Sequence, residues 1–205
     1  MGEVRCTMKN LFQQQEVLML VLGSVISLVS TMIGFFAQTL VTSIIANKGK
    51  VKIYIKSVYN KTTGESWGFR NSTLRQGLMF DVPLWIEIHN TKSTKQIIRN
   101  INLSLYNSKK LIGKTIQVTH YERNGIQNPY GENGSYTFLL DENEIRRFDL
   151  EFIIWEKDID RKNFDEVRIS YYDSKDKYHE ALIFKIDEPW VISKNKIDND
   201  WRLIN

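Results

Sequence analysis

The stretch VLMLVLGSVISLVSTMIGFFAQTLVTSIIAN, residues 17–47, contains no charged side chain. Its 31 residues would form about 46 Å of α-helix, whereas ~20 apolar residues are enough to cross the hydrocarbon core of a bilayer. Two crossings joined by a turn would need about 40 residues or more. The stretch therefore predicts one transmembrane helix over residues 17–46, with the excess length taken up by tilt.

This helix divides the chain into three parts. We expect a short polar tail over residues 1–16, the helix over residues 17–46, and a separate domain over residues 47–205. A cleaved signal peptide is the competing interpretation, but its apolar region is usually about half as long and begins closer to the first residue. A buried core helix would need a large surrounding bundle, whereas the rest of the chain predicts strands.

Basic residues flank the helix unequally. Arg5 and Lys9 precede it, and five lysines follow within residues 48–61. Because flanking Lys and Arg residues favour the cytoplasmic side, we expect a single-pass protein of the cell membrane with its large domain in the cytoplasm. The first four lysines should then lie along anionic lipid headgroups. They are Lys48, Lys50, Lys52 and Lys56. An outward-facing domain, with these lysines as solvated strand residues, is the alternative.

Small residues recur along the predicted helix at spacings of 4, 3, 4 and 3, which places them on one face. This face comprises Gly23, Ser27, Ser30, Gly34 and Ala37, with Gln38 at its border. Helices in lipid associate through close backbone approach at small residues and through polar contacts. The face predicts a homo-oligomer or docking to another membrane helix. Because Gly, Ser and Thr are common in membrane helices, a chance alignment is the alternative.

After residue 48 the apolar residues alternate with polar ones, as in strands with one buried and one wet face. The pattern is clear over residues 51–59, 101–107 and 147–155. We expect about eight or nine strands in an antiparallel β-sandwich or small barrel. Residues 166–172 and 178–186 predict a hairpin. Pro83 cannot donate a hydrogen bond to a ladder, so its strand should begin there or lie at an edge.

Residues 82–115 carry a resemblance to a known family. They combine a strand ending at Asn90, a polar turn, an apolar strand closing on Leu105–Tyr106–Asn107, and a short turn with Gly113. This segment resembles the immunoglobulin-like modules of bacterial surface and membrane proteins, of the FxLYD and late-embryogenesis-abundant type. Asn107 stands where Asp is more usual in that pattern. The resemblance implies a sandwich used for binding or spacing, with no catalytic residues.

No motif predicts a catalytic residue, a metal site or a cofactor. His89, His120 and His179 are far apart in the sequence, and the single cysteine, Cys6, precedes the helix. Metal sites usually draw on a Cys, His or paired-carboxylate motif, which these residues do not form. Basic residues interleaved with aromatic residues, as in known nucleic-acid readers, are also missing. We therefore expect a protein that is not an enzyme and does not bind nucleic acid.

Charge is distributed unevenly along the domain. Residues 48–123 contain 14 basic and 4 acidic residues, whereas residues 126–205 contain 12 basic and 18 acidic residues. If the division persists in space, the basic part could bind the lipid bilayer or an anionic ligand. If the strands of the two halves interleave, the charges will instead mix on each face.

Two functions fit these features. The first is a non-enzymatic, membrane-anchored β-domain that acts as a self-associating binding or scaffold module. The second is a ligand-triggered membrane effector, similar to the membrane-anchored β-barrel effectors of bacterial anti-phage defence, which would oligomerise through its transmembrane helix. Those effectors carry paired helices, whereas this sequence predicts one. A polar cavity inside a closed barrel would favour the effector.

Overall fold

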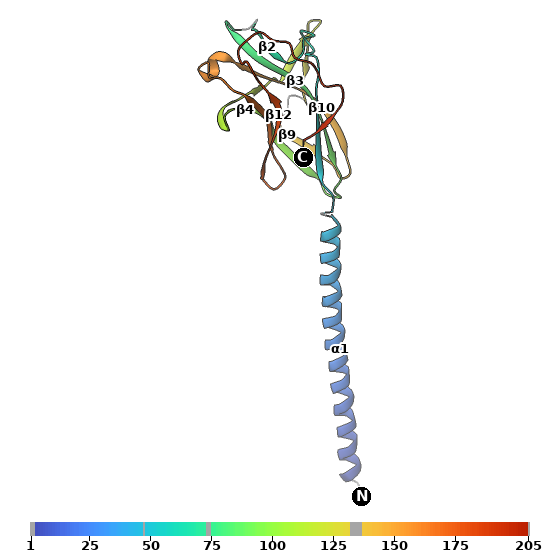
Figure 1. Cartoon of the computed structure of the whole chain (residues 1–205). Coiled ribbons are helices and arrows are strands. Elements are labelled where there is room, and N and C mark those ends of the chain that lie inside the picture. Colours follow the sequence, from blue (N-terminus) through green and yellow to red (C-terminus); the bar gives the residue numbers. More distant parts are fainter. Residues whose placement is uncertain (1–2, 47, 73–74, 132–136, 205) are drawn as a thin grey trace. The chain divides into compact units, whose positions relative to one another are not determined.

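The computed structural model describes residues 3–46, 48–72, 75–131 and 137–204. It contains two compact units, Met1–Asn47 and Lys48–Asn205. The first consists of helix α1, Glu3–Ala46, which is uninterrupted (Figure 1). Its part Gln15–Ala46 is long and apolar enough to cross a membrane, a criterion that a signal sequence also meets. Of the predicted segment boundaries, residues 1–2, 47 and 205 lie outside the described residues.

The predicted polar tail is helical from Glu3 onward, so α1 extends beyond its apolar part. The backbone N–H and C=O groups of a helix are satisfied within the helix. This property allows the same element to continue from a polar into an apolar environment.

The second unit is built from two antiparallel sheets and a small hairpin (Figure 1). The first sheet has the strand order β13–β1–β3–β10–β6, and β2 also pairs with β3. Its strands are β1 (Val51–Ser57), β2 (Gly68–Asn71), β3 (Leu78–Asn90), β6 (Ile116–Gln117), β10 (Ile145–Trp155) and β13 (Arg202–Leu203).

The second sheet has the order β12–β11–β4–β5, and β9 also pairs with β4. Its strands are β4 (Gln96–Asn107), β5 (Lys110–Lys114), β9 (Thr137–Leu140), β11 (Glu166–Tyr172) and β12 (Tyr178–Lys185). The predicted hairpin is confirmed by the pairing of β11 with β12. A 3₁₀ turn, η1 (Glu156–Ile159), follows β10, and β7 (His120–Arg123) pairs with β8 (Ile126–Pro129). Strands of only two residues are too short to give a periodic signal, so the sequence does not predict them.

An apolar core fills the space between the two sheets. Alternate residues of β3 point into it, and each is fully buried: Phe80, Val82, Leu84, Ile86 and Ile88. The second sheet contributes a matching set: Ile101, Leu103, Leu105, Val167 and Ile169. Full burial of such a side chain stabilises the fold by about 1.5–3 kcal/mol, so this core is the main source of stability. The predicted fold, an antiparallel β-sandwich after one N-terminal apolar helix, is confirmed.

The predicted position of Pro83 is wrong. Strand β3 does not begin at Pro83 or lie at an edge, because it runs from Leu78 and pairs with β10 along its whole length. On its other side, β3 pairs with β2 up to Asp81 and with β1 from Leu84 onward. Pro83 therefore lies where β3 changes partner, a position where a missing N–H interrupts neither ladder.

Part of the outer face of the first sheet is closed to solvent, although the alternating pattern suggests that this face is open. Asp81 is 1% exposed and Glu151 is 7% exposed, although both point away from the core. Tyr130, which follows β8, bonds to the Glu151 carboxylate, and Lys61 forms an ion pair with Asp149 at 2.7 Å. The β7–β8 hairpin and the loop after β1 therefore cover this face.

The segment after β12 packs across the end of the sandwich. The N–H groups of Ser193 and Asn195 donate to the carbonyls of Phe69 and Trp67 at 3.0 and 3.1 Å. A Cβ at Gly68, whose φ is +151°, would lie 2.2 Å from the Ser193 carbonyl oxygen. Glycine at residue 68 therefore permits this close approach.

Candidate functional site

All six predicted association residues lie on the exposed surface of α1: Gly23, Ser27, Ser30, Gly34, Ala37 and Gln38. A Cβ added to Gly23 or Gly34 would meet no atom within 4 Å. The isolated chain thus leaves this face open, and larger side chains fit there without a clash inside the chain.

Hydroxyl groups elsewhere on the helix are satisfied by its own backbone. Thr31, Thr39 and Thr42 each donate to the carbonyl four residues earlier at 2.8 Å. Within the described residues, the hydroxyls of Ser27 and Ser30 make no such bond. A hydroxyl without a partner inside its own helix can gain a hydrogen bond from a second helix in lipid, so these two serines are suited to an interhelical contact.

The four predicted headgroup lysines differ in their surroundings. Lys50 and Lys52 line a pocket of about 460 Å³ at one end of the sandwich. The Lys56 ammonium instead donates to the Asn199 carbonyl at 2.9 Å, and exposed Lys48 lies outside the pocket lining. The other lysines of the pocket, Lys92 and Lys175, come from the turns after β3 and β11.

The sequence reasoning missed these two lysines, although a signal was present. Strand β3 is antiparallel to β1, so the turn after β3 returns to the end where β1 begins. Counting strand directions could therefore have joined the lysines of the two segments. The division of charge along the chain does not separate the sheets, because the first sheet contains β1 and β3 as well as β10 and β13.

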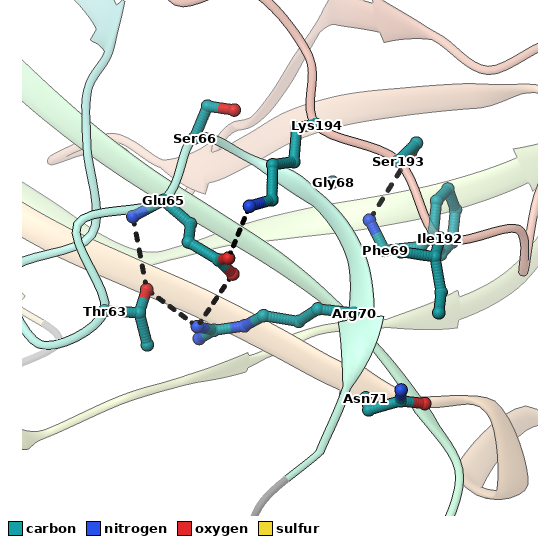
Figure 2. A pocket seen from close by; sticks show the side chains of 10 residues that line it. All are labelled: Thr63, Glu65, Ser66, Gly68, Phe69, Arg70, Asn71, Ile192, Ser193 and Lys194. Atoms are coloured by element: carbon teal, nitrogen blue, oxygen red, sulfur yellow. Dashed lines mark hydrogen bonds and ion pairs between the residues drawn. The ribbon is translucent and has the colours of Figure 1, made fainter.

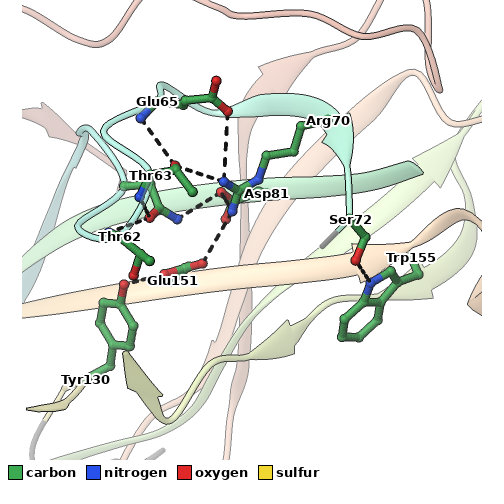
Figure 3. A network of polar contacts seen from close by, with 10 residues as sticks. Thr62, Thr63, Glu65, Arg70, Ser72, Asp81, Tyr130, Glu151 and Trp155 are labelled. Atoms are coloured by element: carbon green, nitrogen blue, oxygen red, sulfur yellow. Dashed lines mark hydrogen bonds and ion pairs between the residues drawn. The ribbon is translucent and has the colours of Figure 1, made fainter. Parts of the chain in front are cut away.

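A second group of polar residues surrounds Arg70 on the outer face of the first sheet, where the loop after β1 and the β7–β8 hairpin cover that face (Figure 3). The Arg70 Nη2 atom lies 2.6 Å from Asp81 Oδ2 and 3.9 Å from Glu151 Oε1, and the Nη1 atom lies 3.9 Å from Glu65 Oε2. Arg70 Nη1 also donates to Thr63 Oγ1 at 2.8 Å. One guanidinium thus joins β2, β3, β10 and the loop after β1. We call these residues, with Asn60 and Tyr130, the Arg70 network.

The Arg70 network contains more carboxyl groups than cations. Burial and the neighbouring Glu151 raise the pKa of Asp81 to about 8, against the opposing effects of Arg70 and of the Asn60 amide. Asn60 donates to Asp81 Oδ2 at 3.0 Å, while Oδ1 has no hydrogen-bond partner within the described residues. Asp81 therefore retains a proton near neutral pH.

Two surface pockets lie on either side of Arg70. One, of about 390 Å³, is lined by the loop after β1, by β2 and by residues 192–194 (Figure 2). Here Lys194 forms an ion pair with Glu65 at 2.8 Å, a hydrogen bond that lowers the pKa of Glu65. The other, of about 330 Å³, includes His120, Glu122 and Glu151 in its lining. Arg70 lines both pockets, and its ion pairs hold it in place.

The contacts of the Arg70 network hold β2, β3, β10 and the loop after β1 together. Its charged groups are paired with one another, so breaking one pair would leave a buried charge without a partner. Within the part of the chain that the structure describes, no group of three or more His, Cys, Asp or Glu residues is placed to hold a metal ion.

Two packed antiparallel sheets with a filled apolar core, which follow an apolar helix in the chain, define a β-sandwich protein. A family model described as the YopI Ig-like domain matches residues 49–183. The match spans more than half of the chain, so the chain belongs to the YopI Ig-like domain family. The expected immunoglobulin-like character is confirmed, but the matching family is not the FxLYD or late-embryogenesis-abundant type. Searches of curated proteins and of solved structures gave no significant match.

Proposed function

We propose that this chain is a single-span membrane protein whose β-domain is a non-enzymatic binding or scaffold module. The observation that carries the proposal is the apolar part of the helix, Gln15–Ala46, whose most apolar stretch is not buried by the rest of the protein. So long an exposed apolar surface is unfavourable in water and favourable in a bilayer. The linked sandwich supports a binding role, because its family is immunoglobulin-like.

The apolar core favours this function over a ligand-triggered effector. An effector domain that senses a small molecule inside a barrel needs a polar interior cavity. The side chains between the two sheets are instead apolar and close-packed, with Phe80, Leu103 and Phe152 fully buried. Partners are then expected at the surface of the domain.

Copies of the chain associate, in this proposal, through the helix face from Gly23 to Gln38. Replacing Gly34 with leucine should weaken self-association by about 1 kcal/mol, or roughly fivefold, because the larger side chain separates the two backbones. The expected readout is a lower crosslinked or energy-transfer signal between copies in membranes. Ile33→Leu is the matched control and should behave like the original chain. If both variants associate normally, this face does not mediate assembly.

The proposed orientation places the β-domain in the cytoplasm, and Cys6 provides the test. As the single cysteine, it reports the side of the amino-terminal segment. A membrane-impermeant maleimide should label Cys6 in intact cells, or in spheroplasts where an outer membrane intervenes. Labelling only after lysis would place the domain outside. A mature chain from which Cys6 has been removed would identify the helix as a cleaved signal sequence.

A further inference from the structure

Three separate segments bring basic side chains to the pocket of about 460 Å³ at the start of β1. Lys50 directly precedes β1 and Lys52 is its second residue, Lys92 comes from the turn after β3, and Lys175 comes from the turn between β11 and β12. We call this the basic pocket. Because the lysines are distant in sequence, only the folded sandwich assembles their charges.

The positive charge of the basic pocket is not compensated by carboxylates. Within the described residues, none of its four lysines forms an ion pair, and the Lys92 ammonium donates instead to the neutral Gln96 Oε1 at 3.3 Å. Like charges gathered in a concave site raise the local positive potential. An anion that enters the pocket would relieve this repulsion.

The one carboxylate in the lining, Asp173, is already engaged. Its Oδ2 atom lies 2.8 Å from His179 Nε2, and its Oδ1 atom accepts the N–H groups of Lys175 and Lys177 at 2.8 and 3.0 Å. Burial opposes ionisation of Asp173, but these hydrogen bonds outweigh it and lower its pKa. The carboxylate thus fixes the turn that carries Lys175 and is not directed to the lysine ammonium groups.

The backbone that carries Lys50 is also fixed. The Lys50 N–H donates to Thr91 Oγ1, and the Thr91 hydroxyl lies 2.8 Å from the Lys50 carbonyl oxygen. Gly49 has a φ of +111°, and a Cβ there would lie 2.3 Å from the Thr91 carbonyl oxygen. Glycine allows the two segments to meet, so the first lysines of the pocket are held against the turn that carries Lys92.

We propose that the basic pocket binds a phosphate group, either on the headgroup of an anionic lipid or on a soluble phosphoester. Ammonium groups from several directions suit a compact anion with several oxygens. Lys50 follows the end of α1 by four residues, which limits their Cα separation to roughly 15 Å. Binding of a lipid headgroup rests on the proposed membrane anchoring, whereas binding of a soluble phosphoester does not.

The test uses the full chain in detergent micelles. One arm adds inorganic phosphate, or sodium chloride at equal ionic strength, and the other compares micelles containing phosphatidylglycerol or phosphatidylcholine. Thermal unfolding reports binding. The double variant Lys92→Gln/Lys175→Gln should bind roughly 25-fold more weakly, because each lysine near an anionic group contributes about a factor of five. The matched control is Lys109→Gln/Lys110→Gln, which changes two exposed lysines, one in the turn before β5 and one at its first residue.

Stabilisation by phosphate identifies a soluble phosphoester, and stabilisation by phosphatidylglycerol alone identifies a lipid headgroup, if the pocket variant loses it and the control keeps it. No stabilisation in either arm, or an equal response from all three proteins, would overturn the proposal. Extraction of membranes at alkaline pH tests the anchoring separately. A chain that leaves the membrane in this extraction contradicts the anchoring without affecting the phosphate arm.

Discussion

Replacing Arg70 with methionine should lower the free energy of unfolding by about 3–5 kcal/mol above pH 8. The guanidinium is the cation of the Arg70 network, and its removal leaves Asp81 and Glu151 buried together without it. Methionine keeps much of the apolar stem, so the loss of packing is small. At pH 5 the effect should be smaller, because Asp81 then holds a proton.

Urea unfolding of the full chain in detergent, followed by tryptophan fluorescence, measures this effect, since all five tryptophans follow residue 48. Arg99→Met is the matched control. Arg99 pairs with Asp176 at 2.5 Å, but the two side chains are 46% and 75% exposed, so its loss should cost at most about 1 kcal/mol. Equal losses of unfolding free energy from the two substitutions would show that the Arg70 network does not stabilise the fold more than a surface ion pair does.

Replacing Asp81 with asparagine should remove part of the pH dependence of stability. Because the folded-state pKa of Asp81 is raised to about 8, the folded chain retains a proton that the unfolded chain loses near pH 4. The original chain should therefore lose stability as the pH rises from about 4 to 8, by up to about 1.4 kcal/mol per pH unit, and level off above pH 8. Asparagine is neutral throughout and should not show this loss.

The measured quantity is the difference in unfolding free energy between the two proteins at pH 5, 6, 7 and 8. Groups whose pKa is lowered, such as Asp173 and Asp141, contribute less to the free energy of unfolding as the pH falls. Their contribution is the same in both proteins, so it cancels in this difference. The unfolding free energy of the variant should rise relative to that of the original chain at each increase in pH. A difference that stays constant with pH would show that Asp81 is ionised in the folded state.

The elements with a strong periodic signal were predictable from the sequence. The uncharged run over residues 17–47 predicts the apolar helix, and the alternation over residues 147–155 predicts β10. Both predictions depend on local spacing, which needs no knowledge of the tertiary fold. The sequence was equally sufficient for the hairpin of β11 and β12.

The burial of the Arg70 network was not predictable in the same way. In β10, Glu151 alternates with apolar residues and should face water, but Tyr130 and the β7–β8 hairpin cover it. Which segment covers a sheet face depends on contacts between distant parts of the chain. The same limit applies to Pro83, because the exchange of β1 for β2 beside β3 leaves no trace in the spacing of its apolar residues.

The pairing of β1 with β13 also has a consequence for how the protein is made. Ile55 lies opposite Arg202, and Tyr54 opposite Leu203, so the first strand to leave the ribosome pairs along this edge with a strand made much later. Until Arg202 has been synthesised, β1 has an open edge that other chains can pair with. A chain that ends before this residue would leave the edge unpaired and prone to edge-to-edge aggregation, so the last strand of the sheet protects the first.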